Sequence, residues 1–206
     1  MKKLLGLSAL LLALNTTALA QVNTVEENFK IDLKYPAVVL DDTQATHRIN
    51  AYYSHAIDSF TKEIVRSGYN EASTSYEVKY EDDKYLSLAT TYWHYLKGAA
   101  HGMYYTDSAV FAKNTGAALP LSHFLPQLPQ VEALDQAIRE GKVPFYSINS
   151  PEPLGVDSFF GLDHISDSYY IDADRNVYLV YAPYDLACYA VGTTVVKLNP
   201  EIIESL

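Results

Sequence analysis

The sequence predicts an α+β fold, with an antiparallel sheet, one long helix and one short helix. Long stretches alternate apolar and polar residues, as half-buried strands do, and only two stretches have apolar residues at helical spacing. Most of the expected strands follow one another directly along the chain, and the two expected helices are segregated from them. Apolar residues make up 49% of the chain, which is enough for a sizeable core.

A first strand is expected in the alternating stretch NFKIDLKYPAVV, residues 28–39. Pro36 is expected to end regular strand pairing there, because proline has no amide hydrogen. A long amphipathic helix is expected over about residues 43–66. Its apolar positions recur every three or four residues: Ile49, Tyr53, Ile57, Phe60 and Ile64. Asp41, Asp42 and Thr43 are candidate N-caps, and Gly68 is expected to close the helix.

The middle of the chain predicts a hairpin followed by a further strand. In TSYEVKYEDDKYLSLATTYWHYL, two alternating runs flank residues 81–84, which indicates a turn between two strands. A loop, Gly98-Ala99-Ala100-His101-Gly102, precedes the next strand, MYYTDSAVFA. Residues 114–116, Asn-Thr-Gly, are a typical turn sequence.

The C-terminal part predicts a short helix within PQVEALDQAIREGK, with Gly141 as its C-terminal cap. The following stretch, residues 143–163, is rich in proline, serine and phenylalanine and is expected to form an exposed loop and a contact surface. A hairpin around residues 173–176, a bend near Pro183 and a last strand complete the predicted order of elements.

The first 20 residues are typical of an export signal. Lys2 and Lys3 precede an apolar core, residues 4–14, and Ala18-Leu19-Ala20 is an expected cleavage site. The apolar core is shorter than the roughly 20 residues that span a bilayer. We therefore expect an exported protein, periplasmic rather than extracellular, with no membrane span in the mature chain. The mature part, residues 21–206, is expected to be one domain or two packed subdomains, at about 21–115 and 116–206.

The charge of the chain favours some partners over others. The formal charge is −10. Removing Lys2 and Lys3 lowers the 15 basic residues to 13 against 25 acidic ones, so the mature charge is −12. This balance argues against nucleic acid and anionic membranes. It favours a basic partner, or serves only to keep an exported protein soluble.

The glycine loop has two interpretations. Gly98 and Gly102 permit backbone angles that a side chain would resist, so the loop is a turn with a structural His101, or His101 contacts a ligand or acts as a general base. No nucleophile motif accompanies it, so no catalytic residue is assigned. The six histidines are scattered, and DADRN, residues 172–176, lacks the glycine and the closing glutamate of a calcium loop. We expect no metal and no cofactor.

Tyrosines stand out near two motifs, among 18 in the chain. Alternation along strands turns some of them away from the core, where they are suited to bind a protein or to stack on sugar rings. The candidate ligand-binding residues are Gly98, His101, Gly102, Tyr104, Tyr105, Tyr184 and Tyr189. Cys188 is the only cysteine, so no internal disulfide is possible, and it is expected to be a buried small residue.

Two stretches, taken together, resemble a known family. They are YLSLATTYWHYLKGAAHGMYYTDSAVFAKNTGAALPLSHFL and NVYLVYAPYDLACYAVGTTVVKL. In order and spacing they resemble the extracellular domain of RsiV anti-sigma factors and the N-terminal, non-catalytic region of the peptidoglycan deacetylase PdaC. Ala99 and Cys188 depart from the residues that are commoner there, glycine and proline. The resemblance covers nearly all of the mature chain.

The resemblance implies an α+β fold, an envelope location and a binding role, since the RsiV module senses lysozyme by binding it. This sequence shows no deacetylase domain. We therefore expect a non-enzymatic envelope module that binds a basic protein such as a lysozyme, or a peptidoglycan fragment. Two alternatives stay open: a hydrolase of envelope glycans or peptides that uses His101, and an assembly factor that binds another envelope protein.

Overall fold

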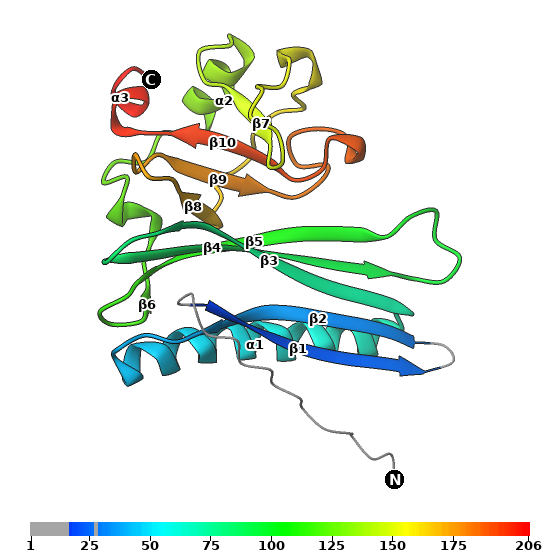
Figure 1. Ribbon diagram of the computed structural model, residues 1–206. Helices are drawn as coiled ribbons and strands as arrows, with labels where there is room; N and C mark the ends of the chain where they lie inside the picture. Colours follow the sequence, from blue (N-terminus) through cyan, green and yellow to red (C-terminus); the bar gives the residue numbers. More distant parts are fainter. Residues whose placement is uncertain (1–16, 27–28) are drawn as a thin grey trace. The chain divides into compact units, whose positions relative to one another are not determined.

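The computed structural model describes residues 17–26 and 29–206 (Figure 1). The described chain forms helices and two mainly antiparallel sheets, which confirms the α+β class with one long helix and one short one. It divides into two compact units that are interleaved in the sequence. Of the described residues, unit 1 comprises 17–26, 29–76, 90–103 and 113–117, and unit 2 comprises 77–89, 104–112 and 118–206. In the described residues, no helix has the length and apolar character needed to cross a membrane.

Unit 1 begins with two paired strands, β1 (Thr17–Glu26) and β2 (Phe29–Val38). They are antiparallel, from Thr17 opposite Val38 to Glu26 opposite Phe29. The predicted cleavage site at residues 18–20 lies within β1, whereas residues 1–16 of the predicted signal lie outside the described residues. Export and the boundaries of the mature domain stay predictions.

Pro36 does not end the pairing of β2, so that expectation was wrong. It lies opposite Leu19, and β2 continues to Val38. On its other side β2 pairs with the next strand only as far as Leu33, opposite Thr74. Pro36 is therefore beyond the part of β2 that has two neighbouring strands, and its missing amide hydrogen is tolerated there.

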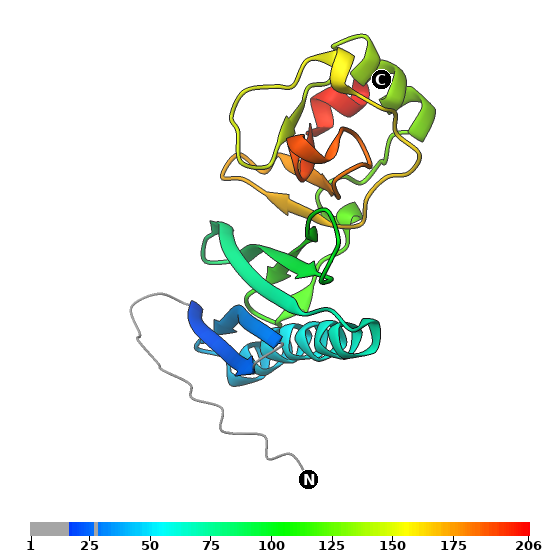
Figure 2. The same cartoon turned by 90° about the vertical axis from the view of Figure 1, so that its right-hand side faces the viewer.

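The long helix, α1 (Thr43–Ser67), begins and ends where the sequence predicted. Oδ1 of Asp42 accepts hydrogen bonds from the amides of Gln44 and Ala45, both at 2.8 Å. Gly68 closes the helix with φ of +69°, a conformation in which glycine pays no steric penalty. The five predicted apolar positions are all buried. Part of this face packs on β2 in a cluster with Leu33, and Figure 2 shows α1 running alongside β2.

Four further strands complete the first sheet: β3 (Glu71–Glu81), β4 (Tyr85–Tyr95), β5 (Met103–Ala112) and the short β6 (Ala117–Ala118). The strand order is β1-β2-β3-β4-β5-β6. Only a short turn separates β3 from β4, as predicted, and Gly116 supports the turn before β6 with φ of +68°. β2 and β3 are parallel because α1 carries the chain back between them.

Unit 2 contains the second sheet, in the order β7-β10-β9-β8. Its strands are β7 (Phe145–Ser147), β8 (Tyr169–Ile171), β9 (Val177–Tyr181) and β10 (Thr194–Leu198), all antiparallel to their neighbours. Alternate residues face opposite sides. One side, with Ile171, Val177 and Leu179, packs against the short helix α2 (Val131–Arg139) in the largest core cluster. The described residues also form three 3₁₀ turns and a short last helix: η1 (Leu121–His123), η2 (Val156–Ser158), η3 (Tyr189–Val191) and α3 (Pro200–Glu204).

Two expectations about unit 2 were wrong. The stretch 143–163 is not wholly an exposed loop, because it contains β7 and η2 and it buries Val143, Phe145 and Phe159 in the core. Cys188 is exposed rather than buried. It is the residue before η3 and lies at the surface.

Candidate functional site

The seven predicted site residues fall into two groups. Gly98, His101 and Gly102 belong to unit 1, and the four tyrosines at 104, 105, 184 and 189 belong to unit 2. Each group has a local geometry of its own. Whether any of them binds a ligand stays a prediction.

A compact turn presents Tyr184. The amide of Ala182 donates to Oδ2 of Asp185 at 2.8 Å, and the amide of Asp185 donates back to the carbonyl of Ala182 at 3.1 Å. The amide of Tyr184 donates to the carbonyl of Ala187, also at 3.1 Å. Leu186 is buried and anchors the turn on the core. The turn is thus held from inside, and the Tyr184 side chain is left 50% exposed.

The backbone of Tyr184 is strained. Its φ is +78°, and among the described residues only Arg175 shares a positive φ without being glycine. A bulky side chain in this region costs on the order of 1–3 kcal/mol, and such residues cluster at binding and active sites. The strain is consistent with a position selected for what its side chain contacts.

Tyr104, Tyr184 and Tyr189 form an aromatic cluster in unit 2. The Tyr189 ring centroid lies 5.7 Å from that of Tyr184 and 5.7 Å from that of Tyr104. Gly192, with φ of +86°, makes room for this cluster, because a Cβ there would lie 2.9 Å from the Tyr104 hydroxyl. Burial, and to a lesser extent the nearby Tyr189, raises the pKa of Tyr104, so its hydroxyl stays a neutral hydrogen-bonding group. Tyr105 follows Tyr104 in β5 and points to the opposite face.

The glycine loop of unit 1 is explained by its own packing. Gly98 has φ of +94°, and its amide donates to the Tyr95 hydroxyl at 3.3 Å. Gly102 lies against Trp93, where an added Cβ would be 2.4 Å from the indole Nε1. Nδ1 of His101 lies 2.9 Å from the carbonyl oxygen of Gly102. These contacts account for both glycines and fit a structural role for His101.

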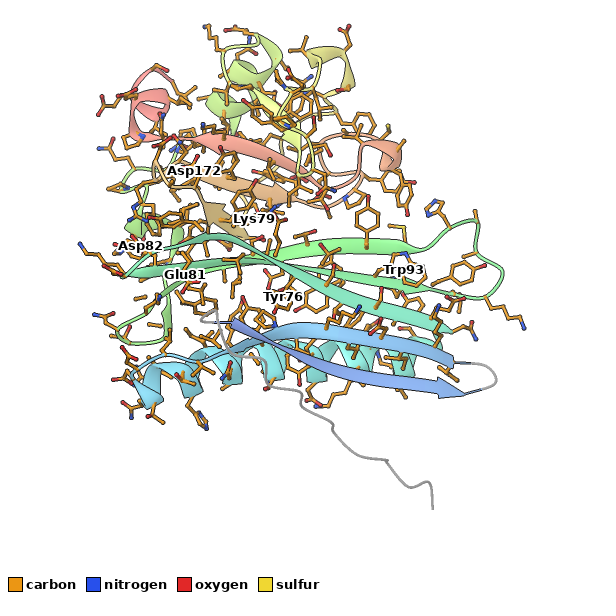
Figure 3. All side chains as sticks on the ribbon, in the orientation of Figure 1. Tyr76, Lys79, Glu81, Asp82, Trp93 and Asp172 are labelled. Carbon is orange, nitrogen blue, oxygen red and sulfur yellow. The ribbon has the colours of Figure 1, made fainter. Side chains whose placement is uncertain are left out.

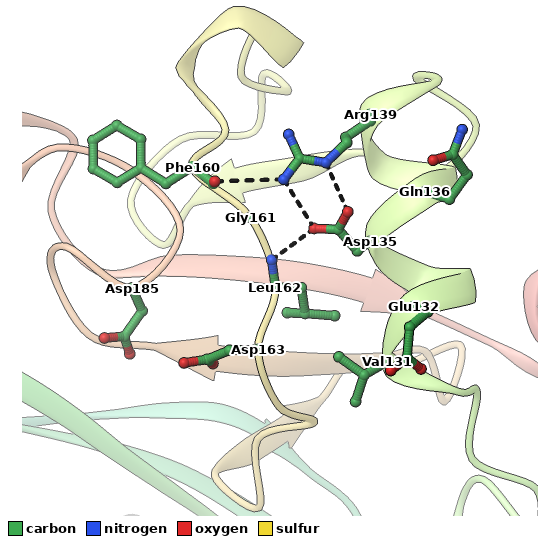
Figure 4. Close-up of a pocket in the computed structure, with 10 residues that line it drawn as sticks. All are labelled: Val131, Glu132, Asp135, Gln136, Arg139, Phe160, Gly161, Leu162, Asp163 and Asp185. Atoms are coloured by element: carbon green, nitrogen blue, oxygen red, sulfur yellow. Dashed lines mark hydrogen bonds and ion pairs between the residues drawn. The ribbon is translucent and has the colours of Figure 1, made fainter.

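A groove beside the Tyr184 turn was not predicted from the sequence. It has a volume of about 700 Å³ and lies between α2 and the segment 160–163, with Asp185 also in its lining (Figure 4). Asp135 organises it, since Oδ2 of Asp135 accepts from Nε of Arg139 at 2.7 Å and Oδ1 accepts from the amide of Leu162 at 2.8 Å. The Arg139 hydrogen bond is the main reason that the pKa of Asp135 lies below its usual range.

The groove is negatively charged. Four carboxylates line it, those of Glu132, Asp135, Asp163 and Asp185, against one guanidinium, that of Arg139. The sequence offered one signal for this groove, the spacing of Asp135 and Arg139 four residues apart on a predicted helix. Such ion pairs are common on helices that line no groove. Within the described chain, no three His, Cys, Asp or Glu residues are placed to share a metal ion.

Comparisons with known proteins bear on the fold. Residues 22–104 match the family model described as "Deacetylase PdaC". A DUF3298 family member from Bacteroides fragilis NCTC 9343 has a similar structure, with a TM-score of 0.60 and 17% identity over 93% of this chain and 94% of that one. A DUF3298 family protein from Pseudomonas aeruginosa PAO1 is similar at a TM-score of 0.59 and 11% identity, over 91% of each chain. No curated protein matches. At these identities the two structures establish a shared fold, and a resemblance to RsiV stays an expectation.

Proposed function

We propose that the protein is an exported, non-enzymatic binding module of the cell envelope. Its ligand is a basic protein such as a lysozyme, or a fragment of peptidoglycan. The observation that carries this proposal is the Tyr184 turn, in which a strained backbone holds an exposed tyrosine beside Tyr104 and Tyr189. Exposed tyrosines on a rigid support make large contacts at a low cost in conformational entropy.

The acidic groove supports a basic partner. Asp185 takes part in both features, because it holds the Tyr184 turn and lines the groove. A protein partner that covers the tyrosines would therefore meet carboxylates next to them. Complementary charge of this kind speeds association and selects partners.

The resemblance to the non-catalytic region of PdaC supports a module without its own catalysis. The match to the PdaC family model covers residues 22–104, which is the part of the chain that contains the glycine loop but not the Tyr184 turn. The similarity to the DUF3298 proteins covers 93% and 91% of this chain. The tyrosines and carboxylates at the Tyr184 turn are suited to form a contact surface.

The first test is calorimetric titration of the purified protein with a basic lysozyme and with soluble muropeptides. We expect heat with one of them, and we expect Tyr184→Ala and Tyr189→Ala to weaken that binding roughly tenfold or more, as truncation of central aromatic contacts does. Tyr52→Ala is the matched control, because Tyr52 is a partly exposed tyrosine on α1 in unit 1.

Three results would contradict the proposal. If neither ligand gives heat, the proposed binding function is wrong. If Tyr52→Ala and Tyr184→Ala lose the same affinity, the ligand does not bind at the Tyr184 turn. Turnover of an envelope glycan or peptide that disappears in a folded His101→Ala variant would establish the hydrolase instead. If turnover persists in that variant, His101 has no part in it, and stable co-purification with another envelope protein would favour an assembly factor.

A further inference from the structure

A second cavity in unit 2 lies on the face of the second sheet that turns away from the main core. Tyr170 of β8 and Tyr178 of β9 are directly opposite each other in the strand register, and both line the cavity. Lys79 of β3, Asp172 and the segment 148–151 line it as well; Figure 3 labels Lys79 and Asp172. Its volume of about 460 Å³ falls within the roughly 300–1,000 Å³ typical of small-molecule sites.

A layered stack forms the rigid wall of this cavity. The rings of Tyr170 and Tyr178 are parallel within 5°, with centroids 4.7 Å apart. Nζ of Lys79 lies 5.2 Å from the Tyr170 centroid, and Nζ of Lys197 lies 5.6 Å from the Tyr178 centroid. The space between the rings is too narrow for an ammonium group, so the two lysines cover the outer ring faces.

The charges around the cavity are paired with one another. Oε2 of Glu77 accepts from Nζ of Lys79 at 2.5 Å. The carboxylate of Asp172 accepts from the Tyr178 hydroxyl at 3.0 Å and from the side-chain amide of Asn176 at 2.8 Å, and it lies 4.0 Å from Nζ of Lys197. A ligand would therefore gain little by carrying a net charge.

Neutral hydrogen-bonding capacity, in contrast, is available. Tyr170 is only 9% exposed and lines the cavity, and its hydroxyl is not one of the fully buried polar atoms that lack a partner in the described chain, so it is open to the cavity. Burial of the ring raises the pKa of Tyr170, so the hydroxyl stays neutral and is able both to donate and to accept. The ammonium of Lys79, whose side chain is 12% exposed, has three hydrogens, and Glu77 is its one acceptor among the described residues.

We propose that this cavity binds a neutral ligand that carries hydroxyl and amide groups, namely an N-acetylated sugar unit. Such a ring combines C–H groups, which suit Ile148, Pro151 and the edge of Tyr178, with hydroxyl and acetamido groups, which suit the Tyr170 hydroxyl and the amide of Asn149. Mixed apolar and polar lining is the general character of ligand sites. The inference rests on the proposed function, since it assigns a place in the fold to the glycan part of a peptidoglycan fragment.

The test is a titration of the ¹⁵N-labelled protein with N,N′-diacetylchitobiose, followed by NMR up to tens of millimolar sugar. We expect the amide signals of residues 148–151 and 77–79 to move together and to saturate. Tyr170→Phe keeps the ring and removes only the hydroxyl, so we expect it to weaken binding about threefold to tenfold. Tyr146→Phe is the matched control, because Tyr146 packs in the same apolar cluster but does not line the cavity.

This inference would be overturned if the amide signals show no saturable shifts. It would also be overturned if a Tyr170→Phe variant with an unchanged melting temperature binds the sugar as tightly as the wild type does. An equal loss in Tyr146→Phe would also overturn it, since the effect would then come from the packing of the cluster. The lysozyme titration distinguishes a failure of the glycan site from a failure of the proposed function. Lysozyme binding that depends on Tyr184 but occurs without sugar binding would leave the proposed function intact and remove the glycan site alone.

Discussion

At the scale of single residues, the requirement for glycine at position 102 comes from a neighbouring side chain and not from the backbone angles of the loop. The sequence predicted that Gly102 permits unusual backbone angles, yet the positive φ in the loop belongs to Gly98. Gly102 is required for a different reason, the close approach of the Trp93 indole. Trp93 in turn lies parallel to the Tyr95 ring, within 8° and at 6.4 Å, so it has little freedom to move aside.

Gly102→Ala should destabilise the protein by roughly 1–3 kcal/mol, because overpacking forces a bulky side chain to shift. Since Trp93 is the single tryptophan, its fluorescence emission reports the shift directly. Urea unfolding and the emission spectrum of the folded state together check this prediction. Gly155→Ala is the control: it has an ordinary φ and no atom within 4 Å of an added Cβ, so both measurements should stay unchanged. A normal spectrum and normal stability in Gly102→Ala would contradict the packing argument.

At the scale of elements, one ion pair joins two turns of unit 2. Asp82, in the turn between β3 and β4, accepts from Nη2 of Arg175, in the turn between β8 and β9, at 2.5 Å. The guanidinium carbon of Arg175 also lies 4.8 Å from the Tyr80 ring centroid and 4.7 Å from that of Tyr85. The same carboxylate accepts from the amide of Tyr85 at 2.7 Å. The pair therefore fixes the turns of two hairpins that are distant in the sequence.

The electrostatics of Asp82 make this connection pH-dependent. Burial by itself would raise the pKa of Asp82, but the hydrogen bonds from Arg175 and from the amides of Tyr85 and Lys84 outweigh it and hold the pKa well below the usual range. A carboxyl whose pKa is lower in the folded state binds its proton more readily when unfolded. It stabilises the fold fully above about pH 5, and this stabilisation is lost as the pH falls through the unfolded value near 3.9 and beyond.

Asp82→Asn should lower the free energy of unfolding by roughly 1.5–3 kcal/mol at pH 7, the range for hydrogen bonds to charged groups. Urea unfolding at pH 7 and pH 3 checks both the loss and its pH dependence, because wild type and variant should approach each other at the lower pH. Asp83→Asn removes the same charge from the same turn, where the side chain is exposed, and should change stability little. A difference between Asp82→Asn and wild type that stays constant from pH 7 to pH 3 would rule out the titration of Asp82 as its cause.

At the scale of the whole molecule, charge is the property most relevant to a partner. The formal charge of −10, or −12 after the expected cleavage, creates a field that acts over the distance at which partners meet. Salt shortens the reach of this field, from roughly 10 Å at 0.1 M to roughly 3 Å at 1 M.

Binding to a basic lysozyme should therefore weaken at least about tenfold between roughly 0.1 and 1 M salt, mostly through slower association. Surface plasmon resonance at several salt concentrations separates the association rate from the dissociation rate. Binding of the neutral disaccharide serves as the internal control and should stay the same across the series. A lysozyme affinity that does not change with salt would exclude charge as the steering force.

The sequence by itself determined the α+β class, the ends and buried face of α1, the hairpin of β3 and β4, and the bounds of β5. These features follow from periodicity and capping, which involve residues close together in the chain. It also identified the tyrosines that cluster at the Tyr184 turn, though not that Tyr105 faces away from Tyr104.

Only the tertiary structure decided the pairings between distant segments. These include the parallel contact of β2 with β3, the pairing of Pro36 within a strand, and the burial of Phe145 in what had been expected to be a loop. The acidic groove beside Asp185 and the stack of Tyr170 on Tyr178 likewise combine separate segments. Which of many possible segments meet is set by the packing of the whole core, and no local pattern in the chain encodes that choice.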